Sequence, residues 1–410
     1  MTKLLNEKIL LVIFIILFIS IRSIHYPLFL NFSKDQALFS IEALNIDREK
    51  PIKLLGPPVS INFEGRQVFQ GPAIYYFQLL FLKLGNFDPL TSSYLFMIFS
   101  AFMILPLYYG MKLLVNKRVA LALIIIYSLL PYYINYTRFF WNPNFQFSLV
   151  PILVLLLGIF KQTRSKLFFL LVSIFMGFLL QFHYQFIIII LGLLIYFFSV
   201  LKIKYTYLII MIGGFSIGFF PLILFEIRNN FYNLQTTILY LNNPRTGQSI
   251  NFSEISHYFL SLSIFSIIVL FSIFNKLNKL FLVTLFIGLF IWSLVLYIPK
   301  PTQSFRTVKN WNYLNEEIVY KTIKEESLSN FNVVNLSYDT LALVQKYFLK
   351  RDSNTIDFAN YSNNKYLYVI NSDTSFMNNP AYEINTFKPS SIIKQWPINT
   401  HYNLYLLERN

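Results

Sequence analysis

The chain has 410 residues, of which 55% are hydrophobic, 19% aromatic and only 13% charged, whereas a soluble globular protein carries about 25% charged residues. This composition excludes a soluble enzyme, a disordered chain and a fibrous repeat. The absence of cysteine excludes disulfides, thiolate metal sites and cysteine nucleophiles. Residues 1–299 hold 22 Lys/Arg and 9 Asp/Glu (+13) and residues 300–410 hold 12 and 10 (+2), so the net charge of +15 belongs to the apolar part and does not indicate nucleic-acid binding.

Apolar runs long enough to cross a bilayer recur along the first three quarters of the chain. A spanning helix needs about 20 predominantly apolar residues. Hydropathy predicts nine spans, at residues 9–30, 90–111, 119–136, 145–160, 167–182, 184–201, 205–225, 258–274 and 280–298. No small-x-small cleavage site follows the first span, which is therefore expected to remain uncleaved. No pair of interrupted spans stands out.

Basic residues gather at alternate ends of these spans. They are Lys3 and Lys8, then Lys112, Lys117 and Arg118, then Lys161, Arg164 and Lys166, then Lys202 and Lys204, and finally Lys276 and Lys279. Under the positive-inside rule this pattern predicts a cytoplasmic N-terminus and an extracytoplasmic C-terminal region. We expect a multi-pass protein of the plasma membrane with the lipid bilayer as its partner.

The apolar segment 71–85 is too short for an ordinary span. If it crossed the membrane, every later basic loop would change sides. We therefore expect a helix that lies in the outer interface or re-enters the membrane, with Tyr75 and Tyr76 at headgroup level.

The predicted fold is a polytopic α-helical membrane domain, residues 1–299, followed by a small extracytoplasmic α/β domain, residues 300–410. Three outer segments of the membrane domain are long enough to contribute to a site: 31–89, 136–144 and 226–257.

Within the C-terminal domain the periodicity predicts short elements of both kinds. A helix over 310–327 has Trp311, Leu314, Ile318, Val319 and Ile323 at helical spacing. A second helix begins after Asp339 or Thr340 and ends near Lys350, with Leu341, Val344 and Phe348 on one face. Strands are expected at 331–336, 366–370 and 403–407.

Asp35, just past the first span, is the strongest catalytic candidate. A carboxylate at a membrane boundary can be poised as a base by modest desolvation, although a solvated helix cap or a partner of Lys34 explains it equally simply. Arg138, Trp141 and Asn142 occupy a short outer turn, where a guanidinium beside aromatic rings and amides suits a phosphate or sugar hydroxyls. The alternative is an interfacial aromatic anchor with a snorkelling arginine.

Further candidates lie in the other outer segments. Glu226 and Arg228 follow the seventh span, where Arg228 could neutralise a lipid phosphate or simply form an end-of-span pair. His183 lies in the outer turn between two spans, where a structural role is common. Lys53 and Arg66 in the first outer loop are additional phosphate-contact candidates.

Several motifs are absent. The sequence has no GxxxxGK phosphate loop, no GxGxxG and no HExxH pair, and the 136–144 turn has no acidic residue. The sequence therefore predicts no metal site and identifies no cofactor. A divalent cation is left open but is not supported.

The order of these features resembles the integral-membrane glycosyltransferases of the GT-C fold, and within them the protein mannosyltransferase and lipid A aminoarabinose transferase group (family 39). The resemblance covers roughly residues 9–230. It rests on the Asp after the first span, on Gly71-Pro-Ala-Ile-Tyr-Tyr76, which is similar to the Pro-Pro-Leu-Tyr-Tyr-type helix, and on the arginine after the third span.

Family members transfer sugars from polyprenyl-phosphate donors on the outer face. The resemblance implies Asp35 as the catalytic residue, Arg138 and Arg228 as contacts of the donor phosphate, and Tyr75 and Tyr76 near the substrate. Two positions depart from the family pattern. Gln36 replaces the second acid of an Asp-Glu pair, and Gln70 occupies the region of a basic or histidine residue, whose role Arg66 or Lys53 would have to supply.

The expected function is therefore transfer of a sugar from a polyprenyl-phosphate donor to a lipid, glycan or protein acceptor. Asp35 would act as base in an inverting displacement. Two alternatives remain open: a lipid-linked glycan polymerase or ligase, and a lipid-linked glycan transporter.

Overall fold

The computed structural model describes residues 2–242, 256–274, 276–352 and 361–410. The chain divides into two compact units. The helical unit consists of Met1–Ile24, Pro51–Phe81 and Tyr94–Ile298, and the sheet unit consists of His25–Lys50, Leu82–Ser93 and Pro299–Asn410. Part of the predicted outer segment 226–257, namely residues 243–255, lies outside the described residues.

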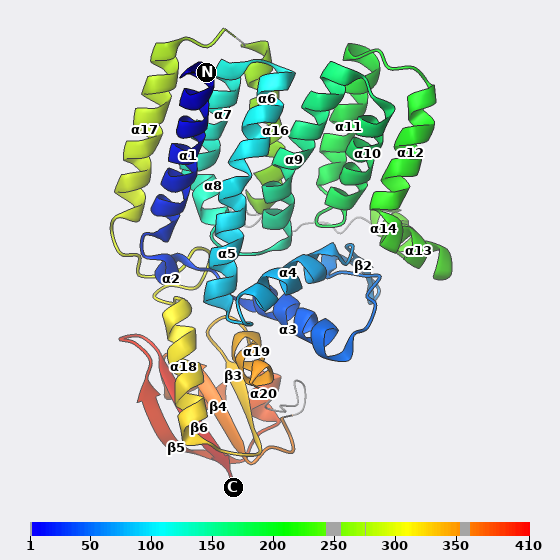
Figure 1. Ribbon diagram of the computed structural model, residues 1–410. Coiled ribbons are helices and arrows are strands. Elements are labelled where there is room, and N and C mark those ends of the chain that lie inside the picture. The colour runs from blue at the N-terminus through cyan, green and yellow to red at the C-terminus, as the bar shows by residue number, and fades with distance from the viewer. Residues whose placement is uncertain (1, 243–255, 275, 353–360) are drawn as a thin grey trace. The chain divides into compact units, whose positions relative to one another are not determined.

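Long apolar helices make up most of the helical unit, and Figure 1 shows them side by side. They are α1 (Thr2–Ser23), α5 (Pro89–Phe102), α6 (Ile104–Leu114), α7 (Lys117–Leu129), α8 (Pro131–Tyr136), α9 (Asn142–Thr163), α10 (Lys166–Leu180), α11 (Phe186–Ile195) with a π turn at Tyr196–Val200, α12 (Thr206–Gly218), α13 (Phe220–Arg228), α14 (Tyr232–Asn242), α16 (Leu260–Ile273) and α17 (Lys279–Tyr297). The chain is thus a helical membrane protein.

Among the described residues, four helical stretches are long and apolar enough to span a membrane. They are Pro89–Leu114, Asn142–Thr163, Ser256–Ile273 and Lys279–Tyr297. A fifth is obtained if α12 and α13, which are bent by 80° relative to each other, are counted as one broken span. From the sequence no pair of interrupted spans was expected, and the described residues contain one such broken span. The nine predicted spans remain a prediction.

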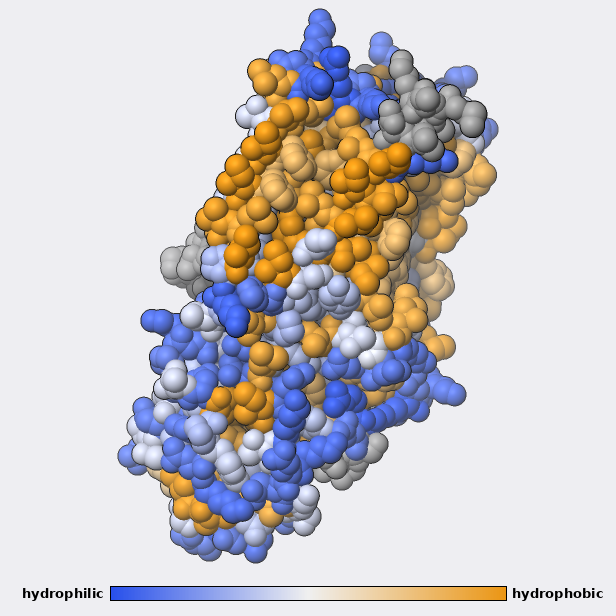
Figure 2. Space-filling model, turned by 60° about the vertical axis from the view of Figure 1, so that its left-hand side comes forward, coloured by the Kyte–Doolittle hydropathy of each residue, from blue (hydrophilic) through white to orange (hydrophobic). Residues whose placement is uncertain are grey.

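Helix α9 forms the centre of the helical unit and α17 lies at its periphery. Of the most apolar 18-residue stretch of α9, 78% is buried, whereas only 11% of the corresponding stretch of α17 is buried. Helix α9 packs between α6 and α10, and α10 packs against α12. Figure 2, in which the side of α17 and α1 comes forward, shows apolar side chains over that face of the helical unit, with hydrophilic side chains at the end that carries the N-terminus.

The short helix expected at 71–85 is present as α4 (Ala73–Leu84). It has 12 residues, shorter than a span. Before it, β1 (Pro58–Phe63) and β2 (Arg66–Phe69) form an antiparallel hairpin, which the sequence did not reveal. The first outer loop therefore contains regular structure in both units.

The sheet unit is built on four strands in the order β3-β4-β6-β5. Its elements are α2 (Tyr26–Phe29), α3 (Lys34–Glu49), α18 (Tyr313–Glu326), β3 (Phe331–Asn335), α19 (Leu343–Arg351), β4 (Tyr366–Asn371), α20 (Tyr382–Asn385), β5 (Ser390–Pro397) and β6 (Asn403–Arg409). Strands β3 and β4 are parallel, and the other two pairings are antiparallel. Val334, Leu367, Val369, Phe387 and Leu407 contribute to its core.

The predicted elements of residues 300–410 agree with α18, β3, α19, β4 and β6, whereas β5 and the short helix α20 were not predicted. Two expected faces were partly wrong, because Leu314, Ile318 and Leu341 are exposed while Tyr313, Glu316 and Tyr320 are buried. Searching for aliphatic residues at helical spacing does not detect a buried helix face that also contains polar side chains, as in α18.

Candidate functional site

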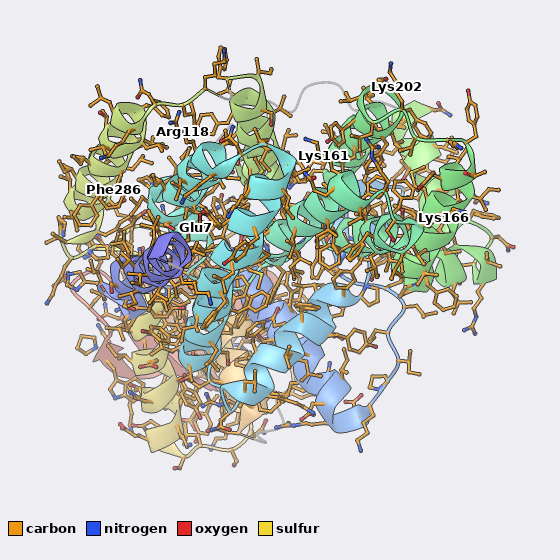
Figure 3. The ribbon with its side chains drawn as sticks, turned by 45° about the horizontal axis from the view of Figure 1, so that its top comes forward. Glu7, Arg118, Lys161, Lys166, Lys202 and Phe286 are labelled. Atoms are coloured by element: carbon orange, nitrogen blue, oxygen red, sulfur yellow. The ribbon has the colours of Figure 1, made fainter. Side chains whose placement is uncertain are left out.

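One end of the helical unit is basic. Figure 3 looks toward this end and labels Arg118, Lys161, Lys166 and Lys202 across it, together with Glu7. The carboxylate of Glu7 pairs with Lys112 at 2.9 Å and with Lys117 at 2.7 Å. The Arg118 guanidinium donates to the Leu277 carbonyl. Since α1, α7, α10 and α12 begin near this end and α9 finishes there, their other ends define the opposite face of the unit.

Two buried arginines lie at the opposite end. Arg22 Nε donates to Thr137 Oγ1 at 2.6 Å, and its other nitrogens donate to the carbonyls of Tyr127 and Ser128. Arg138 donates to the carbonyls of Ile21 and Arg22 at 3.1 and 3.2 Å. These bonds tie the last turn of α1 to the segment after α8.

The position of Arg138 bears on its expected role. Its guanidinium carbon lies 4.4 Å from the ring centre of Tyr297, and the residue is buried. Two of its three nitrogens already donate to backbone carbonyls. A phosphate contact by Arg138 therefore requires this end of the unit to open. Arg22, which we did not select from the sequence, is buried in the same place.

Trp141 and His183 belong to a cluster of rings at the same end. The Trp141 ring lies 4.5 Å from His257, and the two histidine rings lie 6.0 Å apart. Tyr258 is 4.9 Å from His183 and 4.1 Å from His257. The sequence pointed to His183 alone, because 74 residues separate it from His257 and only the fold brings them together.

Amide side chains support this ring cluster. Asn142 Nδ2 donates to Gln70 Oε1 at 2.7 Å, and Gln146 donates to the His183 carbonyl at 2.9 Å. The Gln185 amide N–H approaches His183 Nδ1 at 3.4 Å. Gln70, where the family resemblance implied a basic residue, accepts this hydrogen bond from Asn142, the first residue of α9.

Close backbone approach explains the glycines before α4. The Gly71 amide donates to the Gln181 carbonyl at 3.0 Å. A Cβ on Gly71 would lie 2.5 Å from the Gln181 Cβ, and a Cβ on Gly56 would lie 2.1 Å from the Gly71 carbonyl oxygen. Side chains are excluded at both positions.

The tyrosines of α4 differ in exposure. Tyr75 is buried, whereas Tyr76 is exposed. The Lys53 backbone amide donates to the Tyr76 hydroxyl at 3.1 Å. Of the two, Tyr76 is therefore better placed to meet a substrate or a headgroup.

Glu226, in α13, caps the start of α14. Its two carboxylate oxygens accept from the amides of Asn233 and Leu234, each at 3.2 Å, which satisfies N–H groups that a helix start leaves open. Arg228 is exposed at the end of α13. The Arg66 guanidinium carbon lies 4.6 Å from the ring centre of Tyr232.

Asp35 belongs to the sheet unit. It is exposed in the first turn of α3, where the helix dipole favours a carboxylate. Gln36 completes a capping box: its Oε1 accepts from the Ser33 amide at 3.2 Å and from the Ser33 hydroxyl at 2.9 Å. The departure from an Asp-Glu pair therefore has a structural role in this chain.

Phe32, just before α3, packs its ring against aromatic residues of α18 and α19. The buried Phe32 ring lies 5.4 Å from Tyr347, 6.2 Å from Phe348 and 6.4 Å from Tyr313. At the other end of α3, Arg48 donates to the carbonyls of Lys350 and Arg351, each at 2.8 Å. The C-terminal part of the chain thus holds the helix that carries Asp35.

The sheet unit also contains a buried carboxyl group that the sequence did not reveal. Glu316 accepts from Trp311 Nε1 and Gln345 Nε2, each at 2.6 Å, and from the Tyr338 hydroxyl. Burial raises the pKa of Glu316 from 4.5 to about 7, despite these donors, and nearby Asp339 acts in the same direction. No periodic pattern distinguishes such a residue from a solvated glutamate.

The candidate residues therefore divide between the two units. In the helical unit, Trp141, Asn142 and His183 belong to the ring cluster and its amides, Arg66 and Glu226 contact α14, and Arg138 contacts α1 and Tyr297. The sheet unit carries Asp35. Among the described residues no group of three or more histidine, aspartate or glutamate side chains is arranged to hold a metal ion. Compared with models of known families, with curated proteins and with solved structures, the chain matches none of them.

Proposed function

We propose that the protein is a membrane glycosyltransferase that uses a polyprenyl-phosphate sugar as donor. The observation that supports this best is that the two ends of the helical unit carry different kinds of polar side chain. Lysines gather at one end, while the ring cluster of Trp141 and His183 with its amide neighbours lies at the other, as do Arg138 and the Arg66–Tyr232 pair. A lipid-linked sugar phosphate needs cationic, aromatic and amide groups at one membrane boundary.

The resemblance to the family 39 glycosyltransferases contributes the assignment of roles. Nine spans with a cytoplasmic N-terminus would put the polar end on the outer face of the plasma membrane. The acceptor would be a lipid, a glycan or a protein. No nucleotide is required, in accord with a sequence that lacks phosphate-binding loops.

The reaction would be a single displacement with inversion. The acceptor oxygen or nitrogen forms a bond to the anomeric carbon while Asp35 takes its proton, and the bond from that carbon to the phosphate oxygen breaks. Polyprenyl phosphate leaves with the negative charge. Arg228 is exposed and Arg66 is half-buried, so both are more accessible to a phosphate than Arg138, which is buried with two of its nitrogens donating to carbonyls.

The test is donor turnover by the full chain with its native membranes as the source of acceptor. A panel of polyprenyl-phosphate monosaccharides is supplied, and release of polyprenyl phosphate is measured for wild type, Asp35→Asn and the matched control Asp47→Asn on the same helix. We expect release by wild type and by Asp47→Asn, and a loss of at least about 100-fold for Asp35→Asn, as for removal of a general base.

Each failure has a distinct meaning. Turnover that survives Asp35→Asn would remove Asp35 as base and leave the enzyme class standing. Absence of turnover with every donor and acceptor would contradict the glycosyltransferase assignment and favour the polymerase or transporter. The 80° break between α12 and α13 is one feature in favour of a transporter. Transporters usually have two broken helices at corresponding positions of two repeats.

A further inference from the structure

Helices α13 and α14 continue from α12 at an abrupt angle. Helix α12 begins just after Lys202 and Lys204 at the basic end, and α13 is bent by 80° relative to it. The bend follows Gly218, where a Cβ would lie 1.9 Å from the Ile174 carbonyl oxygen of α10. Figure 1 shows α13 projecting from the helical unit at the end opposite the N-terminus. Helix α13 therefore runs across the direction of α12.

Helix α14 has its polar face turned inward. Asn233 and Thr236 are buried, and Asn233 exchanges two hydrogen bonds with the backbone of Phe69 in β2, at 3.0 and 3.3 Å. The outward face carries Leu234, Ile238 and Leu241, which are 53%, 49% and 67% exposed. Their spacing of four and three residues places them on one stripe.

This arrangement is the reverse of a helix on a water-soluble protein, which buries its apolar stripe and exposes its polar face. A large aliphatic side chain left in water forgoes the burial free energy that stabilises folded proteins. Ile227 and Phe231, which are also exposed, extend the same apolar surface toward α13. The stripe therefore requires an apolar neighbour.

Two features identify that neighbour as lipid. The stripe belongs to the same unit as the exposed apolar side chains of α12, such as Ile209 and Ile212, which face the surroundings of a spanning bundle. Its border is cationic, with exposed Arg228 on α13 and Arg66 stacked on Tyr232, while the nearby carboxylate of Glu226 is used in capping α14. Cationic and aromatic side chains beside an apolar stripe suit phospholipid headgroups.

We propose that α13 and α14 lie along the membrane surface, with Leu234, Ile238 and Leu241 inserted among the acyl chains of the nearer leaflet. Arg228 then lies at the depth of the lipid phosphates. If the proposed glycosyl transfer holds, this depth is also that of the donor's phosphate, and this one consequence rests on the proposed function. The membrane contact itself does not depend on it.

The absence of cysteine makes a direct test straightforward. Single-cysteine variants of the full chain, spin-labelled and placed in lipid nanodiscs, are compared for collision with oxygen, which concentrates in lipid, and with a water-soluble nickel chelate. Ile238→Cys is the test position. Ile291→Cys on α17 and Ser372→Cys in the sheet unit are the references, because both residues are exposed, one on an apolar span and the other beside a strand end.

We expect the ratio of oxygen to nickel collisions at Ile238→Cys to exceed that at Ser372→Cys several-fold and to reach at most that at Ile291→Cys, which lies within a span. Leu234→Cys and Leu241→Cys should behave alike. A ratio equal to that of Ser372→Cys would show the stripe in water and overturn the proposal. Protection from both reagents, or spin coupling between two labelled copies, would show a protein covering the stripe and would also overturn it. None of these readouts depends on enzymatic activity.

Discussion

At the scale of single residues, side chains with the chemistry of an active site often perform a structural role in this chain. Glu226 caps α14, Gln36 closes the capping box of α3, and Arg138 binds the carbonyls of α1. In each case the partner is a backbone group, either an amide at the start of a helix or a carbonyl far away in the sequence. Asp35 is exposed in the first turn of α3, where a base is accessible to solvent.

Glu316 gives a prediction of pH dependence. Its pKa is raised from 4.5 to about 7 in the folded chain, so between these values the folded state binds more protons than the unfolded one. Stability of the sheet unit should therefore fall as pH rises through this window and stay constant above it. At roughly 1.4 kcal/mol per pKa unit, the contribution is about 3 kcal/mol.

Glu316→Gln should remove this dependence because it resembles the protonated carboxyl. Gln345 Oε1 has no hydrogen-bond partner, so that amide can turn to accept from the new amide. Hydrogen exchange of the β3 and β4 amides is compared between variant and wild type at each pH, so that intrinsic exchange rates cancel. We expect similar protection near pH 4.5 and faster exchange in wild type near pH 8. A ratio that does not change with pH would contradict the assigned titration.

At the scale of elements, close helix packing relies on small residues. A Cβ on Gly177 would lie 2.3 Å from the Phe215 carbonyl oxygen, and a Cβ on Gly214 would lie 2.8 Å from the Ser173 Cβ. Small residues at such crossings let helices in a membrane approach closely where no hydrophobic force drives them together. The α10–α12 crossing in turn fixes where α12 ends and α13 turns away.

Gly218→Ala should therefore destabilise the helical unit, because the new Cβ would meet backbone atoms of α10. Overpacking of this kind typically costs about 1–3 kcal/mol. Gly213→Ala on the same helix is the control: nothing lies within 4 Å of its Cβ, and alanine favours a helix by up to about 1 kcal/mol. Thermal unfolding in detergent should show a lower Tm for Gly218→Ala alone. Equal Tm values for the two variants would refute the packing argument.

At the scale of the whole molecule, sequence order and structural units do not coincide. Segments His25–Lys50 and Leu82–Ser93 belong with Pro299–Asn410 in the sheet unit, although both precede most of the apolar helices. Phe32 and Arg48 join the first segment to the C-terminal part, and the Tyr347 hydroxyl joins the second by donating to the Phe87 carbonyl. A change in the C-terminal domain is thus expected to reach Asp35 directly, through one continuous packed unit.

The proposed orientation gives a prediction for the whole chain. Lys202→Cys and Ser372→Cys are labelled with a membrane-impermeant maleimide on intact cells. We expect labelling of Ser372→Cys at once and of Lys202→Cys only after the cells are permeabilised, because basic loops face the cytoplasm. The opposite pattern would rule out outer-face chemistry by Asp35.

Local signals in the sequence determined the class of this protein. The low charge and the apolar runs predicted helical membrane structure. The short patterns after residue 300 predicted α18, β3, α19, β4 and β6. Both are local signals, because hydrophobic periodicity depends only on residues close together in the sequence. The shortness of 71–85 likewise predicted α4 as less than a span. The number of spans and the catalytic role of Asp35 remain predictions.

Tertiary structure alone decided which distant residues meet. His183 joins His257, Phe32 enters the aromatic core beside α19, and Arg22 meets Thr137 across 115 residues. It also decided which face of a helix is covered: in α14 the contacts with β2 show that Asn233 lies on the buried face, while Leu234 and Ile238 are exposed. A sequence specifies that a helix has two faces, but the neighbours that cover each face are set by the packing of the whole chain.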